Sequence, residues 1–413
     1  MMVEFLRCIL CGREYPADYR LTCESCGPRD GILDAVYDYE KARRTLTLES
    51  LASRPRTHWR YKEVLPISRE TPLPPLAVGW TPIYEVPALG KHIGVKTLWL
   101  KDDGRNPTAS FKDRASSVGV AKANEFGFTT VACASTGNAA SSLAGFAASV
   151  GLRSFIFVPQ RAPEPKVAQL LLFGAHVLRV QGTYDEAYDL CSKAVERYGW
   201  YNRNCAINSY LVEGKKTAGL EIGEQMRTSP PDWVAVSVGD GCTIAGVYKG
   251  LSEMVELGIL PRLPRVLGVQ AEGSPAVARQ FVAGEESPFV SKEASTVADS
   301  ICVAVPRNWR KAIRAVKASG GTYVTVSDEE ILDALRYVPR LTGVFGEPAA
   351  VAAVAGVARA RRDNIIGENE SVLAVITGNG LKDIKTAISV AGKPHDIPPS
   401  LDAVDAVVGK ILR

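Results

Sequence analysis

The chain has 413 residues, a net charge of +4, and a composition that is 46% hydrophobic and 23% charged. These values are typical of a globular protein with about two to three domains, and they exclude the basic footprint of a nucleic-acid-binding protein. No apolar run is long enough to span a bilayer, and the first residues lack a signal-peptide pattern. We therefore expect a cytoplasmic protein whose partners are neither nucleic acid nor membrane.

Two Cys-x-x-Cys-Gly turns stand near the N-terminus, Cys8 to Cys11 and Cys23 to Cys26. Glycine after each second cysteine allows a tight turn, and four thiolates suit one tetrahedral zinc. Four cysteines would close the coordination sphere, so such a zinc would be structural; the alternative is a relic knuckle without metal. The scattered cysteines are interpreted as buried apolar residues of a reducing compartment: Cys133, Cys191, Cys205, Cys242 and Cys302.

The chain is predicted to be organised in four parts. Residues 1–30 form a zinc-ribbon-like segment, and residues 31–80 form a connector with a charged helical stretch at 39–51 and a proline-rich run at 66–75. Proline prevents a long helix there, so the run is expected to wrap over the main body. That body covers residues 81–393, and a tail follows at 394–413.

From residue 97 onward, short β-rich runs alternate with helical patterns, which predicts an α/β fold with parallel sheets. The expected strands are 97–100, 129–133, 154–158, 176–180, 206–209, 233–238, 266–270, 322–326 and 372–377. A Rossmann dinucleotide site is the competing interpretation. It is disfavoured, because no Gly-x-Gly-x-x-Gly opens a helix with an acidic residue at the expected distance.

Lys112 is the candidate for a reactive amine. It lies in the string Asn-Pro-Thr-Ala-Ser-Phe-Lys-Asp-Arg at 106–114, and Ser110 is predicted to cap a helix over 111–124. The positive end of that helix and partial burial both lower a lysine pKa, which favours a nucleophilic amine able to form a Schiff base. The alternative for an isolated Ser-x-Lys is a solvated helix lysine.

Three further motifs follow predicted strands. Ser-Thr-Gly-Asn at 135–138 opens a helical segment and suits a carboxylate, although a capped helix start is an equal alternative. Gly-Asp-Gly-Cys-Thr at 239–243 precedes a helix, so its amides could cradle a phosphate. Thr377 ends the last predicted strand, where ligands bind in open α/β sheets.

In this order the motifs resemble those of the fold type II, tryptophan-synthase-β-like enzymes that use pyridoxal 5'-phosphate (PLP), and within them the threonine synthase family. The resemblance spans roughly residues 60–390. It implies two parallel-sheet α/β domains with the cofactor between them, the smaller domain covering about residues 100–210. It also implies an enzyme that acts as a homodimer on a small-molecule amino acid.

The resemblance assigns roles by position. Lys112 would hold PLP and act as catalytic base, with Phe111 beside it, and Thr377 would face the pyridine nitrogen. The substrate carboxylate and the cofactor's phenolic oxygen would be met by the turn Ser135, Thr136, Gly137 and Asn138. The cofactor phosphate would be held by Gly239, Asp240, Gly241, Cys242 and Thr243, with the Asp240 carboxylate pointing away. Glu347 is interpreted as a structural helix start, and the alternative is that it lines the cofactor.

The implied reaction converts O-phosphohomoserine and water to threonine and phosphate. The family often carries an arginine before Glu-Gly-x-Lys, whereas this chain has none at 208–216, and Ala109 and Ala115 stand where glycine is usual. The nearest replacement cations are Lys215, Lys216, Arg153 and Arg161. The alternatives are a serine or threonine ammonia-lyase, a β-replacement synthase, or a zinc-ribbon binding protein on a catalytically silent body.

Overall fold

A computed structural model describes residues 3–162 and 164–412. The first two residues of the predicted segment 1–30 and the last residue of the predicted tail lie outside these ranges. The N-terminal part is an antiparallel sheet of order β2-β1-β3, formed by Val3–Cys8, Glu14–Tyr15 and Leu33–Tyr37. Short helices follow at Gly27–Asp30 (α1), Tyr39–Arg43 (α2) and Leu48–Ala52 (α3), with a 3-10 helix at His58–Val64 (η1).

The large sheet has the order β12-β11-β10-β13-β5-β4, and all neighbours except β4 and β5 are parallel. Its strands are Ile83–Glu85 (β4), Thr97–Asp102 (β5), Trp233–Ser237 (β10), Arg265–Ala271 (β11), Thr322–Val326 (β12) and Ser371–Ile376 (β13). Successive side chains of β10 serve two cores: Val234 and Val236 pack on one face, and Ala235 packs on the other. This alternation buries both faces of the sheet.

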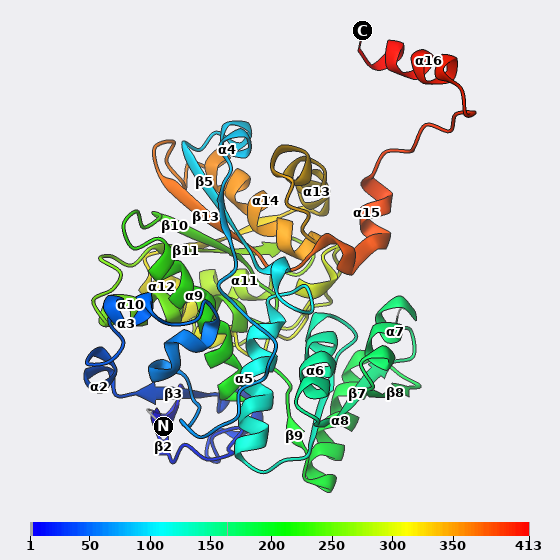
Figure 1. Cartoon of the computed structure of the whole chain (residues 1–413). Helices are drawn as coiled ribbons and strands as arrows, with labels where there is room; N and C mark the ends of the chain where they lie inside the picture. The colour runs from blue at the N-terminus through cyan, green and yellow to red at the C-terminus, as the bar shows by residue number, and fades with distance from the viewer. Residues whose placement is uncertain (1–2, 163, 413) are drawn as a thin grey trace.

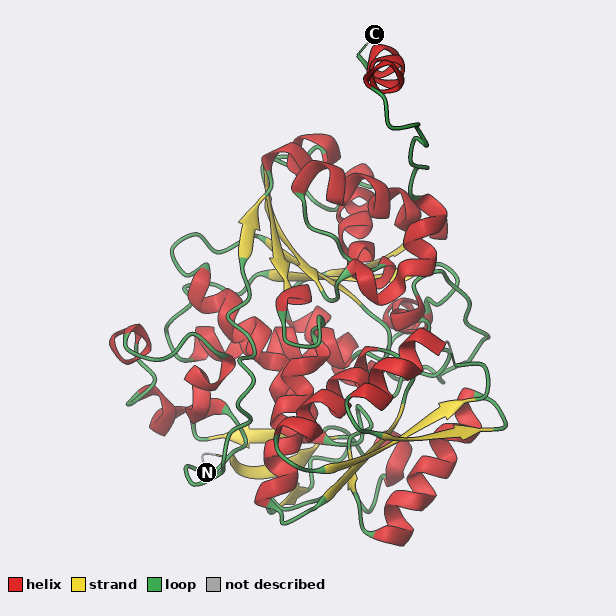
Figure 2. Ribbon diagram, turned by 45° about the vertical axis from the view of Figure 1, so that its right-hand side comes forward, coloured by secondary structure: helices red, strands yellow, loops and turns green. Residues whose placement is uncertain are grey.

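Helices cover both faces of the large sheet (Figures 1 and 2). One face carries Ser209–Gln225 (α9), Cys242–Glu256 (α10) and Trp309–Ala318 (α12), and the other carries Pro87–Ile93 (α4), Asp328–Thr342 (α13) and Pro348–Arg362 (α14). Ala276–Ala283 (α11) packs against β11 and β12. Short 3-10 helices lie at Asp103–Arg105 (η2), Asp299–Ile301 (η3) and Gly380–Asp383 (η4).

The small sheet has the order β8-β7-β6-β9 and is entirely parallel. Its strands are Thr130–Ala134 (β6), Arg153–Pro159 (β7), His176–Val180 (β8) and Tyr201–Asn202 (β9). It is surrounded by Lys112–Glu125 (α5), Asn138–Ser149 (α6), Glu164–Leu172 (α7) and Tyr184–Tyr198 (α8). The prediction of two parallel-sheet α/β domains is therefore confirmed (Figure 1).

Two local predictions are wrong. The strand expected at 206–209 is instead a loop that ends at the first residue of α9, and the fourth strand is β9, a few residues earlier. Ser110 does not cap α5, because the residue before that helix is Phe111 and no side-chain cap is formed. The Asp113 carboxylate instead accepts a hydrogen bond of 2.6 Å from the amide of Thr108.

The chain ends in two helices, Ile384–Val390 (α15) and Leu401–Ile411 (α16). Helix α16 stands away from the body after an extended linker (Figures 1 and 2). It buries none of its residues. Along the described ranges, no helix combines the length and the apolar character needed to cross a bilayer.

Candidate active site

A cavity of about 550 Å³ lies between the two sheets. The loops that follow β10 and β13 of the large sheet and β6 of the small sheet reach it, and so does Lys112 at the start of α5. The carboxyl ends of parallel strands share one edge of a sheet, which is where open α/β sheets bind their ligands. The cavity lining includes every predicted site residue of the body except Phe111, namely Lys112, Ser135, Thr136, Gly137, Asn138, Gly239, Asp240, Gly241, Cys242, Thr243 and Thr377.

Lys112 is the first residue of helix α5, and its side chain lines the cavity. Burial lowers its pKa, and the positive charges of Lys215 and Arg203 lower it further. Among the described residues, no carboxylate forms an ion pair with its amine. The neighbouring Phe111 is buried in the core and donates its amide to the Thr377 carbonyl at 2.8 Å. Lys112 thus offers an amine that is easily deprotonated.

The turn at residues 135–138 is held by a residue from a distant helix. The Asn138 Nδ2 donates to Oε1 of Glu347 at 2.7 Å, and both side chains are buried. Burial raises the pKa of Glu347 to about 7, although the charges of Lys112 and Lys382 oppose the rise. Glu347 lies on the cavity wall, as the alternative of a cofactor-lining residue requires, and 209 residues of sequence separate it from Asn138.

The loop at 239–243 leads into helix α10, whose first residues line the cavity. Gly241 has a φ of 91°, and a Cβ there would lie 2.8 Å from the Asn308 carbonyl oxygen. No side chain caps α10, so its first amides remain available to an anion. The Asp240 carboxylate accepts a hydrogen bond of 2.6 Å from the amide of Arg307. A phosphate group therefore fits this helix end.

The cavity also contains Arg203 and Arg307, which the sequence did not single out, beside the expected Lys215. Arg203 and Lys215 line it, and both contact the Cys205 sulfur, at 3.2 and 3.3 Å. Arg203 lies directly after β9. The sequence pattern predicts this strand at 206–209 and therefore does not identify Arg203 as a site residue. A strand predicted to end at residue 202 would have put Arg203 at the edge of the sheet where ligands bind. Arg307 lies at the same cavity, with its guanidinium 4.0 Å from the Tyr188 ring centroid.

Of the four replacement cations expected from the sequence, only Lys215 lines this cavity. Lys216 is buried in ion pairs with Glu213 and Glu253, at 2.6 and 2.9 Å. Arg153 is exposed and donates to Thr129 Oγ1 at 3.2 Å, and Arg161 is exposed. Whether each cation reaches the cavity depends on the direction in which its side chain points from its helix or strand. The order of residues in the sequence does not give this direction.

The four N-terminal cysteines form a second centre, apart from the cavity. The sulfurs of Cys8, Cys11, Cys23 and Cys26 all lie within 4.8 Å of one another, and Cys11 and Cys23 are 3.7 Å apart. Four sulfurs placed tetrahedrally at 2.3 Å from a zinc would be separated by roughly 3.8 Å. The donor set therefore fits a tetrahedral zinc.

The chain matches the family model described as pyridoxal-phosphate dependent enzyme over residues 75–378, and it belongs to that family. Its relatives include threonine synthases. The one from Methanosarcina acetivorans is 40% identical over 98% of this chain and 99% of its own length. The one from Methanocaldococcus jannaschii is 36% identical over 98% of this chain and 99% of its own.

Solved structures agree with the fold. A processed threonine deaminase isoform 2 from Solanum lycopersicum superposes with a TM-score of 0.65 at 20% identity, covering 92% of this chain and 99% of that one. A diaminopropionate ammonia lyase from Escherichia coli gives 0.65 at 16% identity, covering 94% and 98%. At such identities these likenesses establish the architecture alone.

Proposed function

We propose that this chain is a threonine synthase, which converts O-phosphohomoserine and water to threonine and phosphate. The observation that carries the proposal is the convergence of four motifs on one cavity, in a chain related over nearly its full length to two archaeal threonine synthases. PLP bound in this cavity would supply an electron sink for negative charge at the substrate Cα. The residues of the chain would bind, orient and move protons.

Lys112 is the residue that we propose for cofactor attachment and for proton transfer. Its lowered pKa increases the fraction of neutral amine near pH 7, which is the form that acts as nucleophile and as base. Once released, the amine would take the proton from Cα and return protons along the substrate chain. Its freedom from carboxylate partners supports this role, because an ion pair would keep the amine charged.

Three groups are proposed to hold the cofactor and the substrate carboxylate. The first turn of α10 would bind the cofactor phosphate, and the uncharged Thr377 hydroxyl would face the pyridine nitrogen. Asn138 would donate to the phenolic oxygen, and the turn at 135–137 would bind the carboxylate. A hydroxyl beside the ring nitrogen leaves it largely unprotonated, which moderates the electron sink and favours elimination with replacement.

We propose that Arg203 and Lys215 bind the substrate phosphate in place of the missing family arginine. A charge-assisted hydrogen bond contributes about 1.5–3 kcal/mol, so Lys215→Met should raise KM for O-phosphohomoserine roughly 10- to 150-fold. The matched control is Arg153→Met, an exposed cation that does not line this cavity. Weakened PLP binding with an unchanged KM would instead assign Lys215 to the cofactor phosphate.

The decisive assay measures products from competing substrates. We expect phosphate release from O-phosphohomoserine to be faster than ammonia release from serine or threonine. Faster ammonia release would reject the proposal and favour an ammonia-lyase of the same fold. Purified protein without the visible absorbance of bound PLP would instead support a catalytically silent body.

We further propose one structural zinc per chain on Cys8, Cys11, Cys23 and Cys26, with a role in local folding. Metal analysis of protein purified under reducing conditions without chelator should find about one zinc per chain. Cys11→Ser should lose most of it, whereas Cys302→Ser, at a scattered cysteine, should keep it. A metal-free wild-type protein would mean that the segment is a relic knuckle.

The substrate of an enzyme of this family is a small-molecule amino acid. We propose in addition that the chain works in the cytoplasm as a homodimer, without nucleic acid or membrane. The resemblance to the threonine synthase family supports the dimer. Light scattering of the purified holoenzyme would test it, and a monomer mass would reject it.

A further inference from the structure

One wall of the cavity carries two cysteines, Cys205 and Cys242, whose thiol groups the proposed reaction does not use. Cys205 is partly exposed to the cavity, and its sulfur accepts hydrogen bonds from Arg203 Nη1 at 3.2 Å and from Lys215 Nζ at 3.3 Å. Two cations on one sulfur stabilise a thiolate, which is the nucleophilic form of cysteine. The first interpretation of Cys205, as an inert buried apolar residue, does not fit these contacts.

Cys242 is the partner thiol. It is the first residue of α10, and it belongs to the small apolar cluster against which Cys205 packs. Its Sγ donates to the Asp240 carboxylate at 3.7 Å, so it retains its proton. Hydrogen bonding between the two thiols lowers the pKa of Cys205 well below its usual range and raises that of Cys242, and Lys215, Arg203 and Lys112 lower the pKa of Cys205 further.

The other cysteines outside the N-terminal cluster have different surroundings. Cys133 lines the cavity but is buried, and burial raises its pKa; Cys191 is buried, and burial raises its pKa to about 12. Cys302 also lines the cavity, but burial and the charge of Asp299 raise its pKa. Reactivity toward electrophiles follows thiolate character and access together. Cys205 is the cysteine of this group that combines both.

We propose that Cys205 and Cys242 form an oxidation site that takes hydrogen peroxide as its substrate and closes to a disulfide. The Cys205 thiolate attacks one peroxide oxygen, the O–O bond breaks, and the departing hydroxide takes a proton to leave as water. Cys205 is then a sulfenic acid. The Cys242 sulfur attacks the Cys205 sulfur, the S–O bond breaks, and a second water leaves with the Cys242 proton. Two thiols are oxidised by two electrons, and one peroxide is reduced to two waters.

The test treats the holoenzyme with hydrogen peroxide and maps its peptides by mass spectrometry. We expect a Cys205–Cys242 cross-link that has lost two hydrogens and that dithiothreitol reverses. In Cys242→Ser, Cys205 should accumulate as a sulfenic acid that dimedone traps. In Cys205→Ser, Cys242 should remain reduced. A cross-link elsewhere, or oxidation of Cys302 as fast as that of Cys205, would overturn the proposal.

Alkylation gives a second measurement that needs neither turnover nor oxidation. Between pH 6 and 8, the rate of iodoacetamide reaction at Cys205 should stay nearly constant, whereas a cysteine that is protonated there gains about tenfold in rate per pH unit. Lys215→Met should slow the reaction at Cys205 at least about tenfold, and Lys193→Met, at an α8 position that does not line the cavity, should not change it. A tenfold rise per pH unit at wild-type Cys205 would show a protonated thiol and reject the site.

Discussion

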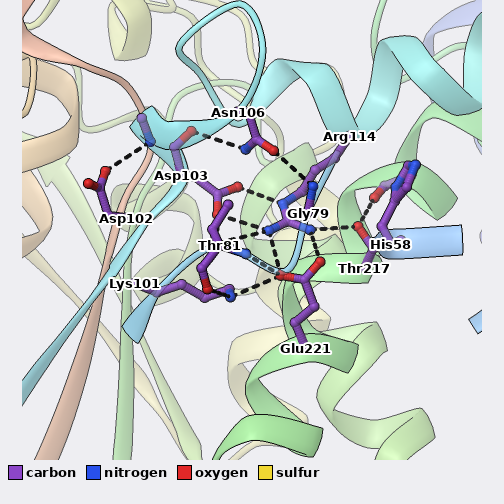
Figure 3. A network of polar contacts seen from close by, with 12 residues as sticks. His58, Gly79, Thr81, Lys101, Asp102, Asp103, Asn106, Arg114, Thr217 and Glu221 are labelled. Atoms are coloured by element: carbon purple, nitrogen blue, oxygen red, sulfur yellow. Dashed lines mark hydrogen bonds and ion pairs between the residues drawn. The ribbon is translucent and has the colours of Figure 1, made fainter. Parts of the chain in front are cut away.

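The first turn of helix α5 carries two cations, Lys112 and Arg114, whose surroundings are opposite. Arg114 is fully buried and forms two-pronged ion pairs with Asp103, at 2.6 and 2.9 Å, and with Glu221, at 2.6 and 2.9 Å (Figure 3). Despite burial, these carboxylates raise its pKa. Lys112, two residues earlier, faces other cations and thiols, and its pKa is lowered. The presence or absence of a carboxylate partner therefore distinguishes the structural cation Arg114 from the reactive Lys112.

The network around Arg114 connects four segments of the chain. Lys101 Nζ pairs with Glu221 at 3.0 Å, and Thr81 Oγ1 donates to Asp103 at 2.7 Å (Figure 3). These contacts tie the end of β5 and the start of α5 to α9. The same turn of α5 that is anchored by Arg114 presents Lys112 to the cavity, so the network orients the reactive amine.

The largest expected effect is on catalysis at Lys112. Lys112→Ala should reduce phosphate release by at least about 10³-fold, because it removes the proposed attachment point and base. The free energy of unfolding should change by less than about 1 kcal/mol, since no residue of the described ranges forms an ion pair with the amine. Urea denaturation and a phosphate assay measure the two quantities. Borohydride should fix PLP to Lys112 in the wild type, and an adduct on any other lysine would contradict the assignment.

Arg114 should show the reverse pattern. Arg114→Met should lower the free energy of unfolding by about 3–5 kcal/mol, because Asp103 and Glu221 would stay buried with only Lys101 to compensate them. The control Arg179→Met breaks an exposed pair with Glu164 and should cost less than about 1 kcal/mol. Equal urea midpoints for the two variants would show that the network does not stabilise the fold.

The pH dependence of stability at Glu347 tests whether this carboxyl group is the counter-ion of Lys112. The folded-state pKa of Glu347 is about 7, above its usual 4.5. Between pH 4.5 and 7 the acid is therefore mostly protonated in the folded protein and mostly ionised in the unfolded one. Between these two values stability should fall as pH rises, by roughly 3 kcal/mol in total, and level off above pH 7. Glu347→Gln in cofactor-free protein should lack this decline. Parallel stability curves for variant and wild type would mean that Glu347 is already ionised as a partner of Lys112.

The smallest expected effect concerns the loop that leads into the first turn of α5, which carries both Lys112 and Arg114. Ala109 has a φ of 63°, in the left-handed region where a Cβ is strained. Ala109→Gly should raise the free energy of unfolding by about 0.5–1 kcal/mol, after the greater freedom of glycine in the unfolded chain is subtracted. Ala115→Gly, inside α5, should lower it by about 1 kcal/mol. The urea concentration at the midpoint of unfolding should thus rise in Ala109→Gly and fall in Ala115→Gly.

The sequence by itself determined the features that depend on neighbours along the chain. Lys112 at a helix start, the turn at 135–138, the loop before α10 and the paired Cys-x-x-Cys turns are local arrangements of strand, turn and helix. The order of strands and helices likewise predicted the parallel sheets. Local backbone geometry and residue type suffice for these, because each motif is a short stretch of neighbouring residues, and three of them lie within βα connections.

Only the tertiary structure decided which distant groups meet. Glu347 reaches Asn138 across 209 residues, and Glu221 reaches Arg114 across 107. The effect of burial on charge depends on which partners arrive with it, so the same helix turn yields a lowered lysine pKa and a raised arginine pKa. Residue order encodes neither the partners nor the direction in which Lys215 and Lys216 point.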